Sequence, residues 1–194
     1  MVPGILVLLV TLISFFLSGM NIVREKELGT IEQLNVTPIH KYQFIVGKLL
    51  PFWVIALIEL AFGLSLGKLL FHIPMLGSVP LVFGVAGIYL IAILGFGLLI
   101  STLTDTQQQA MFISWFFMVV FILMSGLFTP IESMPGWAQT LTLFNPIAYF
   151  ISIMRQVLLK GAGFSDILRP FWSLCLYALV MISLAVFRYR KATA

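Results

Sequence analysis

Residues 24–38 read REKELGTIEQLNVTP and form the only polar island between two long hydrophobic segments. The hydrocarbon core of a bilayer is about 30 Å thick, and a helix of roughly 20 apolar residues crosses it. Each flanking segment is long enough to do so. The polar island therefore connects two membrane spans, and its charged side chains lie in water beside the membrane.

The composition assigns the chain to the integral membrane proteins. Of its 194 residues, 61% are hydrophobic and 9% are charged, whereas roughly 25% are charged in an average soluble domain. A bilayer accepts so apolar a chain only if its backbone polar groups are paired within helices or a closed barrel. The apolar runs are continuous and lack an alternation of period two, which favours helices. We therefore predict an all-α, polytopic helical membrane protein.

About five apolar runs are long enough for transmembrane helices. They cover residues 3–20, 49–71, 79–103, 109–128 and 170–187. A further apolar stretch, residues 145–159, would be only about 22 Å long as a helix. We predict that it forms a short re-entrant or interfacial helix on the outer side, with Asn145 as its N-cap and Pro146 at its first position. Trp137, before it, is expected at the membrane surface.

The positions of Lys and Arg predict the orientation, because these residues are enriched in cytoplasmic connections. The larger set flanks the first two spans and closes the chain: Arg24, Lys26, Lys41, Lys48, Arg188, Arg190 and Lys191. Five spans place all of these on one face, which we expect to be cytosolic. The smaller set falls on the outer face: Lys68, Arg155, Lys160 and Arg169.

The first span begins without a basic flank that would orient it. A signal peptide within residues 1–20 is one interpretation, but the run lacks a positive n-region and ends in SGMN, which is a poor cleavage site. We prefer a true span whose usual upstream partner is missing or is supplied separately.

Several motifs follow one another along the chain in a particular order. They are Val2-Pro3-Gly4-Ile5, Arg24-Glu25-Lys26-Glu27-x-Gly29-Thr30-x-Glu32-x-Leu34-x-x-Thr37-Pro38, Gly47-Lys48-Leu49-Leu50-Pro51, Gly95-x-Gly97-Leu98-x-Ile100-Ser101, Ser125-Gly126-x-x-x-Pro130-Ile131 and Asn145-Pro146. In this order they resemble the ABC-2 type permeases of bacterial inner membranes, which are the membrane subunits of ABC exporters. The resemblance covers essentially the whole chain.

The resemblance implies a six-span permease with a large external domain between its first two spans. Such permeases work as homo- or heterodimers with two ATP-binding subunits. Residues 1–194 would then be a single ABC-2 type transmembrane domain that lacks the first span and the external domain. The expected location is the bacterial inner membrane, with a second permease chain and the lipid bilayer as further partners. The chain itself would bind no cofactor, and ATP would act through the partner subunit.

The polar island has the features of a short amphipathic helix along the membrane. Residues 24–34 are rich in helix formers, the spacing of Glu27, Ile31 and Leu34 places apolar side chains on one face, and Pro38 disfavours helix at Thr37. Its mixed charges suit a protein surface better than lipid. The alternative is a solvated loop with local charge pairs.

The resemblance implies that this segment is a cytosolic coupling helix, which receives the ATP-driven motion of the partner subunit. Its expected contact residues are Arg24, Glu25, Lys26, Glu27, Gly29, Thr30, Glu32, Leu34, Thr37 and Pro38. The polar turn at residues 104–109 is a second candidate contact, although a plain connection between helices is the better interpretation there.

Glu59 is the one acid expected well inside a span, where a charge costs about 2.5 to 3.5 kcal/mol on insertion scales. It should face protein or water. It could line the substrate path or sense protons. The favoured interpretation is a buried carboxyl that is hydrogen-bonded to a neighbouring helix or lies across a dimer contact.

An enzyme would need residues that this sequence lacks. His40 and His72 fall on opposite expected faces of the membrane, and the sequence contains no His-Glu-x-x-His pair. It contains neither a Gly-x-Ser-x-Gly nucleophile motif nor a Gly-x-x-x-x-Gly-Lys-Ser/Thr phosphate loop. The net charge of +4 follows from membrane orientation, so it does not indicate nucleic-acid binding.

Two functions remain open at this point. The first is a permease subunit of an ABC-type exporter that moves a hydrophobic or amphipathic substrate out of the cytoplasm. The second is a truncated or accessory membrane protein that docks an ATPase or a sister permease without transporting. The sequence does not identify a substrate.

Overall fold

The computed structural model describes residues 2–30, 41–72 and 74–188. These residues form α-helices, two short 3-10 turns and no strand, which confirms the all-α prediction for the described part of the chain. The helices are α1 (Val2–Glu27), α3 (Lys41–Phe71), α4 (Val79–Leu103), α5 (Gln107–Leu123), α6 (Gly136–Thr142), α7 (Pro146–Lys160) and α8 (Leu168–Arg188). The turns are Ile131–Ser133 and Phe164–Ile167.

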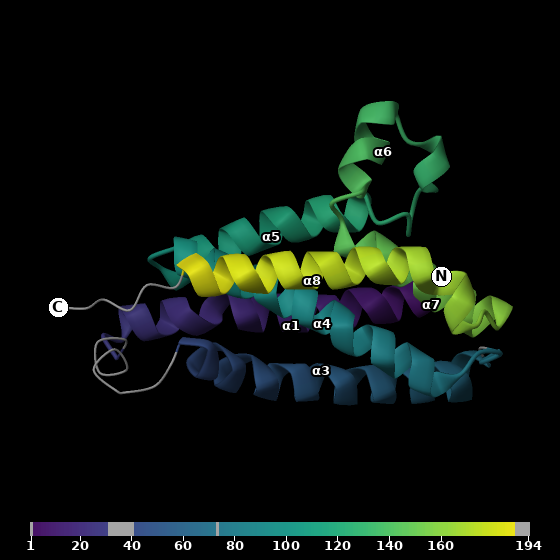
Figure 1. The fold of residues 1–194 in the computed structure, drawn as a ribbon, viewed down its shortest axis with the longest axis horizontal. Helices are drawn as coiled ribbons and strands as arrows, with labels where there is room; N and C mark the ends of the chain where they lie inside the picture. Colours follow the sequence, from purple (N-terminus) through teal and green to yellow (C-terminus); the bar gives the residue numbers. More distant parts are fainter. Residues whose placement is uncertain (1, 31–40, 73, 189–194) are drawn as a thin grey trace.

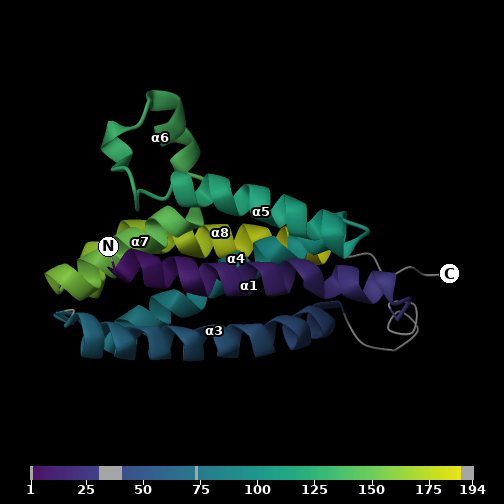
Figure 2. The ribbon, with the colours of Figure 1, turned by 180° about the vertical axis from the view of Figure 1, so that it is seen from behind.

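Five helices, α1, α3, α4, α5 and α8, run along the long axis of the molecule, and α6 projects sideways from it (Figures 1 and 2). We call the end that holds Glu27, Lys48 and Asp105 the inner end, and the opposite end, where α3 ends and α4 begins, the outer end. In Figure 1 the inner end is on the left, and α8 also finishes there. The basic residues at the ends of α1 and α8 therefore share one end of the bundle, as their predicted orientation requires.

Helix α4 is the centre of the bundle, with α1 on one side and α8 on the other. Gly97 faces α1 so closely that an added Cβ would lie 2.8 Å from the Phe15 carbonyl oxygen and 3.1 Å from the Gly19 nitrogen. Gly95 faces α8, where a Cβ would lie 3.0 Å from the Ile182 side chain. Positions two apart point to opposite faces of a helix. Small residues on both faces thus let two backbones approach α4, as is common in membrane helices.

Polar contacts reinforce the packing of α1 on α4. The Ser18 hydroxyl donates to the Leu94 carbonyl oxygen at 2.6 Å. The Ser101 hydroxyl oxygen accepts from the backbone N–H groups of Ile22 and Val23, each at 3.0 Å. These buried bonds satisfy polar groups that lipid could not, so they fix the register of the two helices.

Four of the described helices are long and apolar enough to cross a membrane: Val2–Glu27, Tyr42–Phe71, Val79–Leu103 and Phe164–Arg188. They correspond to four of the predicted spans, and for α4 the boundaries agree. Helices α1 and α3 each continue past the predicted boundary at the inner end. The apolar run marks only the part of a helix that lipid surrounds, whereas the helix itself continues into water.

The predicted span at 109–128 is corrected by the structure. Helix α5 ends at Leu123 and has 17 residues, which makes it about 25 Å long. The Ser125 hydroxyl donates to the Ile122 carbonyl oxygen at 2.6 Å and accepts from the Leu127 N–H at 3.3 Å. Gly126 then has φ of 74°, which turns the chain out of the helix. This helix is shorter than the other four that run along the bundle.

The short helix expected at 145–159 is present as α7. The Asn145 side chain accepts from the Ile147 N–H at 3.0 Å, and Pro146 begins the helix, as predicted. Helices α6 and α7 meet at 82°, the bend of a re-entrant loop or a broken span. The Asn145 amide donates to the Phe121 carbonyl oxygen at 2.7 Å, and the Leu158 carbonyl oxygen accepts from the Leu76 N–H at 3.2 Å. Both contacts lie toward the outer end, which favours the re-entrant arrangement.

We expect Gly97→Ala to lower the free energy of unfolding by about 1–3 kcal/mol, because its Cβ would push the backbones of α1 and α4 apart. The measurement is thermal unfolding in detergent followed by circular dichroism. The control is Gly84→Ala in the same helix, where a Cβ meets nothing within 4 Å. Equal stability of the two variants would show that α1 and α4 do not depend on this close contact.

Candidate functional site

The polar island begins as the last turn of α1, which corrects the prediction of a separate helix over residues 24–34. Helix α1 ends after Glu27. The Gly29 N–H donates to the Lys26 carbonyl oxygen and the Thr30 N–H to the Glu25 carbonyl oxygen, both at 3.1 Å. Gly29 has φ of 69°. This is the Schellman pattern that ends helices, and glycine adopts its left-handed position without strain.

Lys26 joins the end of α1 to the end of α4. Its ammonium group donates to the carbonyl oxygens of Thr102 at 3.2 Å and Thr104 at 2.8 Å. These carbonyls belong to the last residues of α4 and its C-cap, where backbone acceptors lack helical partners. A hydrogen bond from a charged donor contributes about 1.5–3 kcal/mol. The ion pair of Lys26 with Asp105, at 3.8 Å, adds little because Asp105 is 92% exposed.

Glu27 joins the end of α1 to the start of α5. Its carboxylate accepts from the Gln107 backbone N–H at 2.7 Å and from the Gln107 side-chain amide. The Thr106 hydroxyl oxygen, at the N-cap of α5, accepts from the Gln109 N–H at 3.2 Å. A carboxylate at a helix N-terminus is also favoured by the helix dipole. We call the contacts of Lys26, Glu27, Asp105 and Gln107 the inner-end junction.

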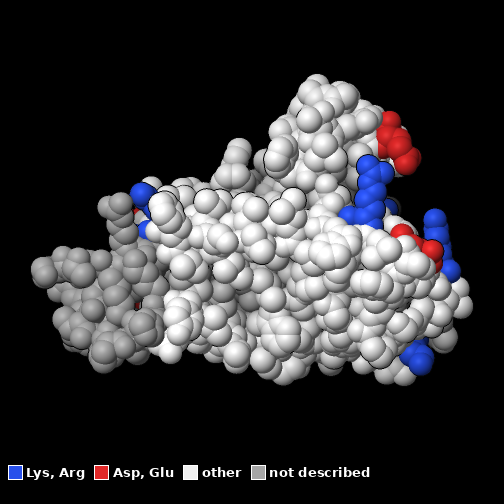
Figure 3. Space-filling model, in the orientation of Figure 1, with Lys and Arg blue, Asp and Glu red and all other residues white. Residues whose placement is uncertain are grey.

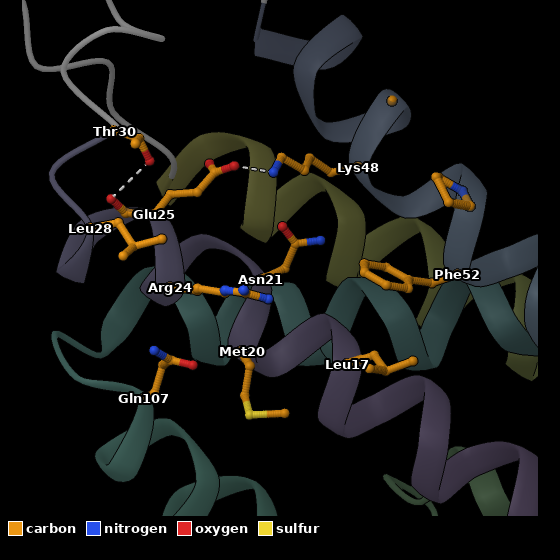
Figure 4. A pocket seen from close by; sticks show the side chains of 12 residues that line it. Leu17, Met20, Asn21, Arg24, Glu25, Leu28, Thr30, Lys48, Phe52 and Gln107 are labelled. Carbon is orange, nitrogen blue, oxygen red and sulfur yellow. Dashed lines mark hydrogen bonds and ion pairs between the residues drawn. The ribbon is translucent and has the colours of Figure 1, made fainter.

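Helix α3 is tied to the same end through an ion pair between Lys48 and Glu25. Figure 4 shows Lys48 reaching from α3 toward Glu25 on α1, beside a hollow of about 570 Å³ that Asn21 and Phe52 also line. Both side chains are partly buried, at 30% and 16% exposed. The second carboxylate oxygen of Glu25 is buried without a partner among the described residues.

The remaining predicted contact residues are distributed around the junction. Arg24 is exposed and lines the hollow. The Thr30 hydroxyl donates to the Glu25 carbonyl oxygen at 3.4 Å. The predicted residues Glu32, Leu34, Thr37 and Pro38 lie outside the described residues.

Apart from Glu59 on α3, the charged side chains of the described residues lie near the two ends of the bundle, and the middle of the face in Figure 3 shows none. Among the described residues, no group of three or more His, Cys, Asp and Glu could hold a metal ion. The contacts at the inner end are ion pairs and capping hydrogen bonds. This end can transmit force between helices and present charges to a partner.

The sequence prediction treated residues 24–38 and the turn at 104–109 as separate candidates, and preferred a plain connection for the turn. The structure brings both together in the inner-end junction. The spacing of these residues in the sequence could not predict their contact, because the joined residues are about 80 positions apart. The complementary charges of Lys26 and Asp105 were the only available signal.

Glu59 lies on α3 between its two ends and faces α1. It lines a groove of about 430 Å³ whose other walls are apolar side chains of α1 and α3. One carboxylate oxygen is buried, and no described residue bonds to it. The hydrogen bond to a neighbouring helix that the sequence analysis favoured is therefore not made for this oxygen within the described chain.

Residues 1–187 match the family model described as ABC-2 family transporter protein. The chain belongs to this family. The resemblance drawn from the sequence motifs is thereby confirmed, and the helices identify a multi-pass membrane protein.

Three relatives of this chain are named as permeases. The chain is 35% identical to the probable multidrug ABC transporter permease YbhR of Escherichia coli strain K12, over 98% of this chain and 52% of that protein. It is 30% identical to the inner membrane transport permease YhhJ of the same strain, over 94% and 49%. It is 26% identical to the linearmycin resistance permease protein LnrN of Bacillus subtilis strain 168, over 76% and 38%. The chain thus spans about half the length of YbhR and YhhJ.

The motifs that carry the resemblance have structural roles in this chain. Gly97 and Ser101 lie in the contact between α4 and α1, and Gly29 ends α1. Asn145 caps α7. The family pattern therefore includes the residues that pack α1 on α4 and shape the inner end.

We expect Lys26→Met to loosen the turn between α4 and α5, because the carbonyls of Thr102 and Thr104 lose their charged donor. Hydrogen–deuterium exchange should become faster at the amides of residues 104–107, by about tenfold. The control is Lys68→Met, at the exposed outer end of α3. Unchanged exchange in Lys26→Met would mean that the turn is held by other contacts.

Proposed function

We propose that this chain is the membrane-spanning permease subunit of an ABC-type exporter, with the inner-end junction as the place where a separate ATP-binding subunit docks. It moves a hydrophobic or amphipathic substrate out of the cytoplasm. ATP is bound and hydrolysed on the partner. The bacterial inner membrane is the proposed location, since the relatives YbhR and YhhJ are E. coli permeases and YhhJ is named as an inner membrane protein.

One observation carries this proposal: three helices are tied to the end of α1 by charged side chains within one helical turn. Glu25 pairs with Lys48 of α3, Lys26 bonds to the end of α4, and Glu27 bonds to Gln107 at the start of α5. A force applied at this end is therefore shared among α1, α3, α4 and α5. A plain connecting loop would leave the helices independent of one another.

The length and packing of α1 determine how a displacement at the inner end would move the helices. This helix has 26 residues, so it extends about 39 Å from the inner to the outer end. It packs on α3, α4, α5 and α7. Closure of the ATP-binding subunits would displace the inner-end junction, and α1 with α4 would tilt as one body. Rigid-body rotation of packed helices is an established way to switch a membrane path.

The family and the names of the relatives support transport. Two of the named relatives carry the words multidrug or resistance and permease. We propose a hydrophobic or amphipathic substrate on this basis, and a second permease chain completes the transporter.

The proposal is tested by purifying the tagged chain from native membranes in mild detergent and identifying by mass spectrometry whether an ATP-binding subunit is recovered with it. Recovery of that subunit in stoichiometric amount supports the proposal. Recovery alone, or only with another membrane protein, would favour the accessory function without transport.

We expect Glu27→Lys to insert normally but to reduce recovery of the ATP-binding subunit at least about fivefold, because it reverses a charge at the docking surface and repels partners selected for an acid there. Leu28→Asp provides a second test, since Leu28 is 66% exposed just beyond α1. The control is Glu132→Lys, an exposed acid of the segment between α5 and α6. Full recovery with both inner-end variants would refute docking at this end.

A further inference from the structure

The groove that contains Glu59 has no role in the inner-end junction. It lies between α1 and α3, well away from Lys48 and Glu25, and reaches toward the outer end, where Val2 and Phe71 line it. Its floor includes Leu6 and Gly63, where a Cβ on Gly63 would lie 2.7 Å from the Leu6 side chain. The two helices thus meet closely at the bottom of the groove and leave it open above.

Glu59 is set apart from the other acids that the structure describes. Glu25, Glu27 and Asp105 lie at the inner end, and Glu132 and Asp166 belong to segments between helices near the outer end. Glu59 alone lies in the interior of an apolar helix. The Glu59 side chain is half-buried, and one of its carboxylate oxygens is buried without a hydrogen-bond partner among the described residues. A cationic group that pairs with this oxygen would gain binding free energy there.

The shape of the groove suits a small molecule. Its volume of about 430 Å³ falls in the usual range of small-ligand sites, which are mostly apolar with a few placed polar groups. A transmembrane helix is about 10 Å wide and needs a longer and larger channel. Phe62 and Phe71 line the same groove, and the face of an aromatic ring attracts a cation.

We propose that this groove binds a lipophilic monocation, whose charge pairs with the Glu59 carboxylate while its apolar groups contact the walls from α1 and α3. Charge complementarity decides the class of ligand. A neutral lipid tail would leave the buried carboxylate oxygen unsatisfied, and an anion would be repelled by it. The inference rests on the proposed function, since it names the substrate class of an exporter.

The probe is tritiated tetraphenylphosphonium, and the sample is the complete chain purified into lipid nanodiscs. Specific binding is the part of the signal that excess unlabelled cation displaces. We expect it to saturate at one cation per chain. Glu59→Gln keeps the size of the side chain and removes its charge, so it should weaken this binding by about tenfold or more. Glu59→Asp keeps the charge and should retain most of the binding. The matched control is Glu132→Gln, which should bind as the unmodified chain does.

Tetraphenylborate, measured separately, has nearly the same shape with the opposite charge and should show no saturable component. Thermal unfolding of each variant confirms that it is folded. The proposal is overturned by equal binding of the cation to Glu59→Gln, by saturable binding of tetraphenylborate, or by no saturable binding of the cation at all. It is also overturned if Phe62→Cys cross-links to a second membrane chain, because a protein would then occupy the groove.

This measurement needs neither ATP nor the ATP-binding subunit. A chain that recovers that subunit but fails to bind the cation would refute only this inference. A chain that binds the cation through Glu59 but recovers no ATP-binding subunit would refute the proposed docking instead.

Discussion

The close contact between the backbones of α1 and α4 is the constraint on which the rest of the bundle depends. In lipid, helices gain little from burying apolar surface against one another, so their association relies on close packing and interhelical hydrogen bonds. Gly97 supplies the space, and the Ser18 and Ser101 hydroxyls supply the bonds. With α1 fixed on one face of α4, Gly95 allows α8 to pack on the other face. The remaining helices are arranged around this central set of three.

The inner-end junction follows from that packing. Because α1 runs beside α4 and extends beyond the predicted span, its last turn arrives at the end of α4. Lys26 and Glu27 can then meet the free carbonyls of α4 and the free N–H groups of α5. These are the backbone groups that helix ends leave unsatisfied. Lys26 and Glu27, which in the sequence look like surface charges, therefore have bonding partners within the chain. Arg24 and Leu28 stay exposed beside them.

Much of this fold could be predicted from hydropathy, and the differences have physical causes. The boundaries of α4 agree because polar residues flank an apolar run on both sides. For α5 the apolar run continues to Phe128, but Ser125 and the positive φ of Gly126 end the helix earlier. For α1 hydropathy could not detect that the helix continues into water as far as Glu27, before the turn at Gly29. The inner-end junction could not be predicted, because it joins residues far apart in sequence whose positions depend on the packing of three helices. The groove around Glu59 likewise required the side chains of two helices.

The central claim is that the end of α1 and the turn between α4 and α5 move as one body when the partner binds ATP. The most direct measurement is the distance between spin labels at Asn21→Cys, near the end of α1, and Gln108→Cys, at the start of α5, by pulsed electron resonance. Cys175 is the one cysteine of the sequence, and it is replaced by Ala so that only these two positions are labelled. It is made on the transporter assembled with a hydrolysis-deficient ATP-binding subunit, with and without ATP. The account predicts the same narrow distance distribution in both states, and a broader one when Lys26→Met is added. A shift of several ångström between the two labels on ATP binding, with the junction residues intact, would contradict it.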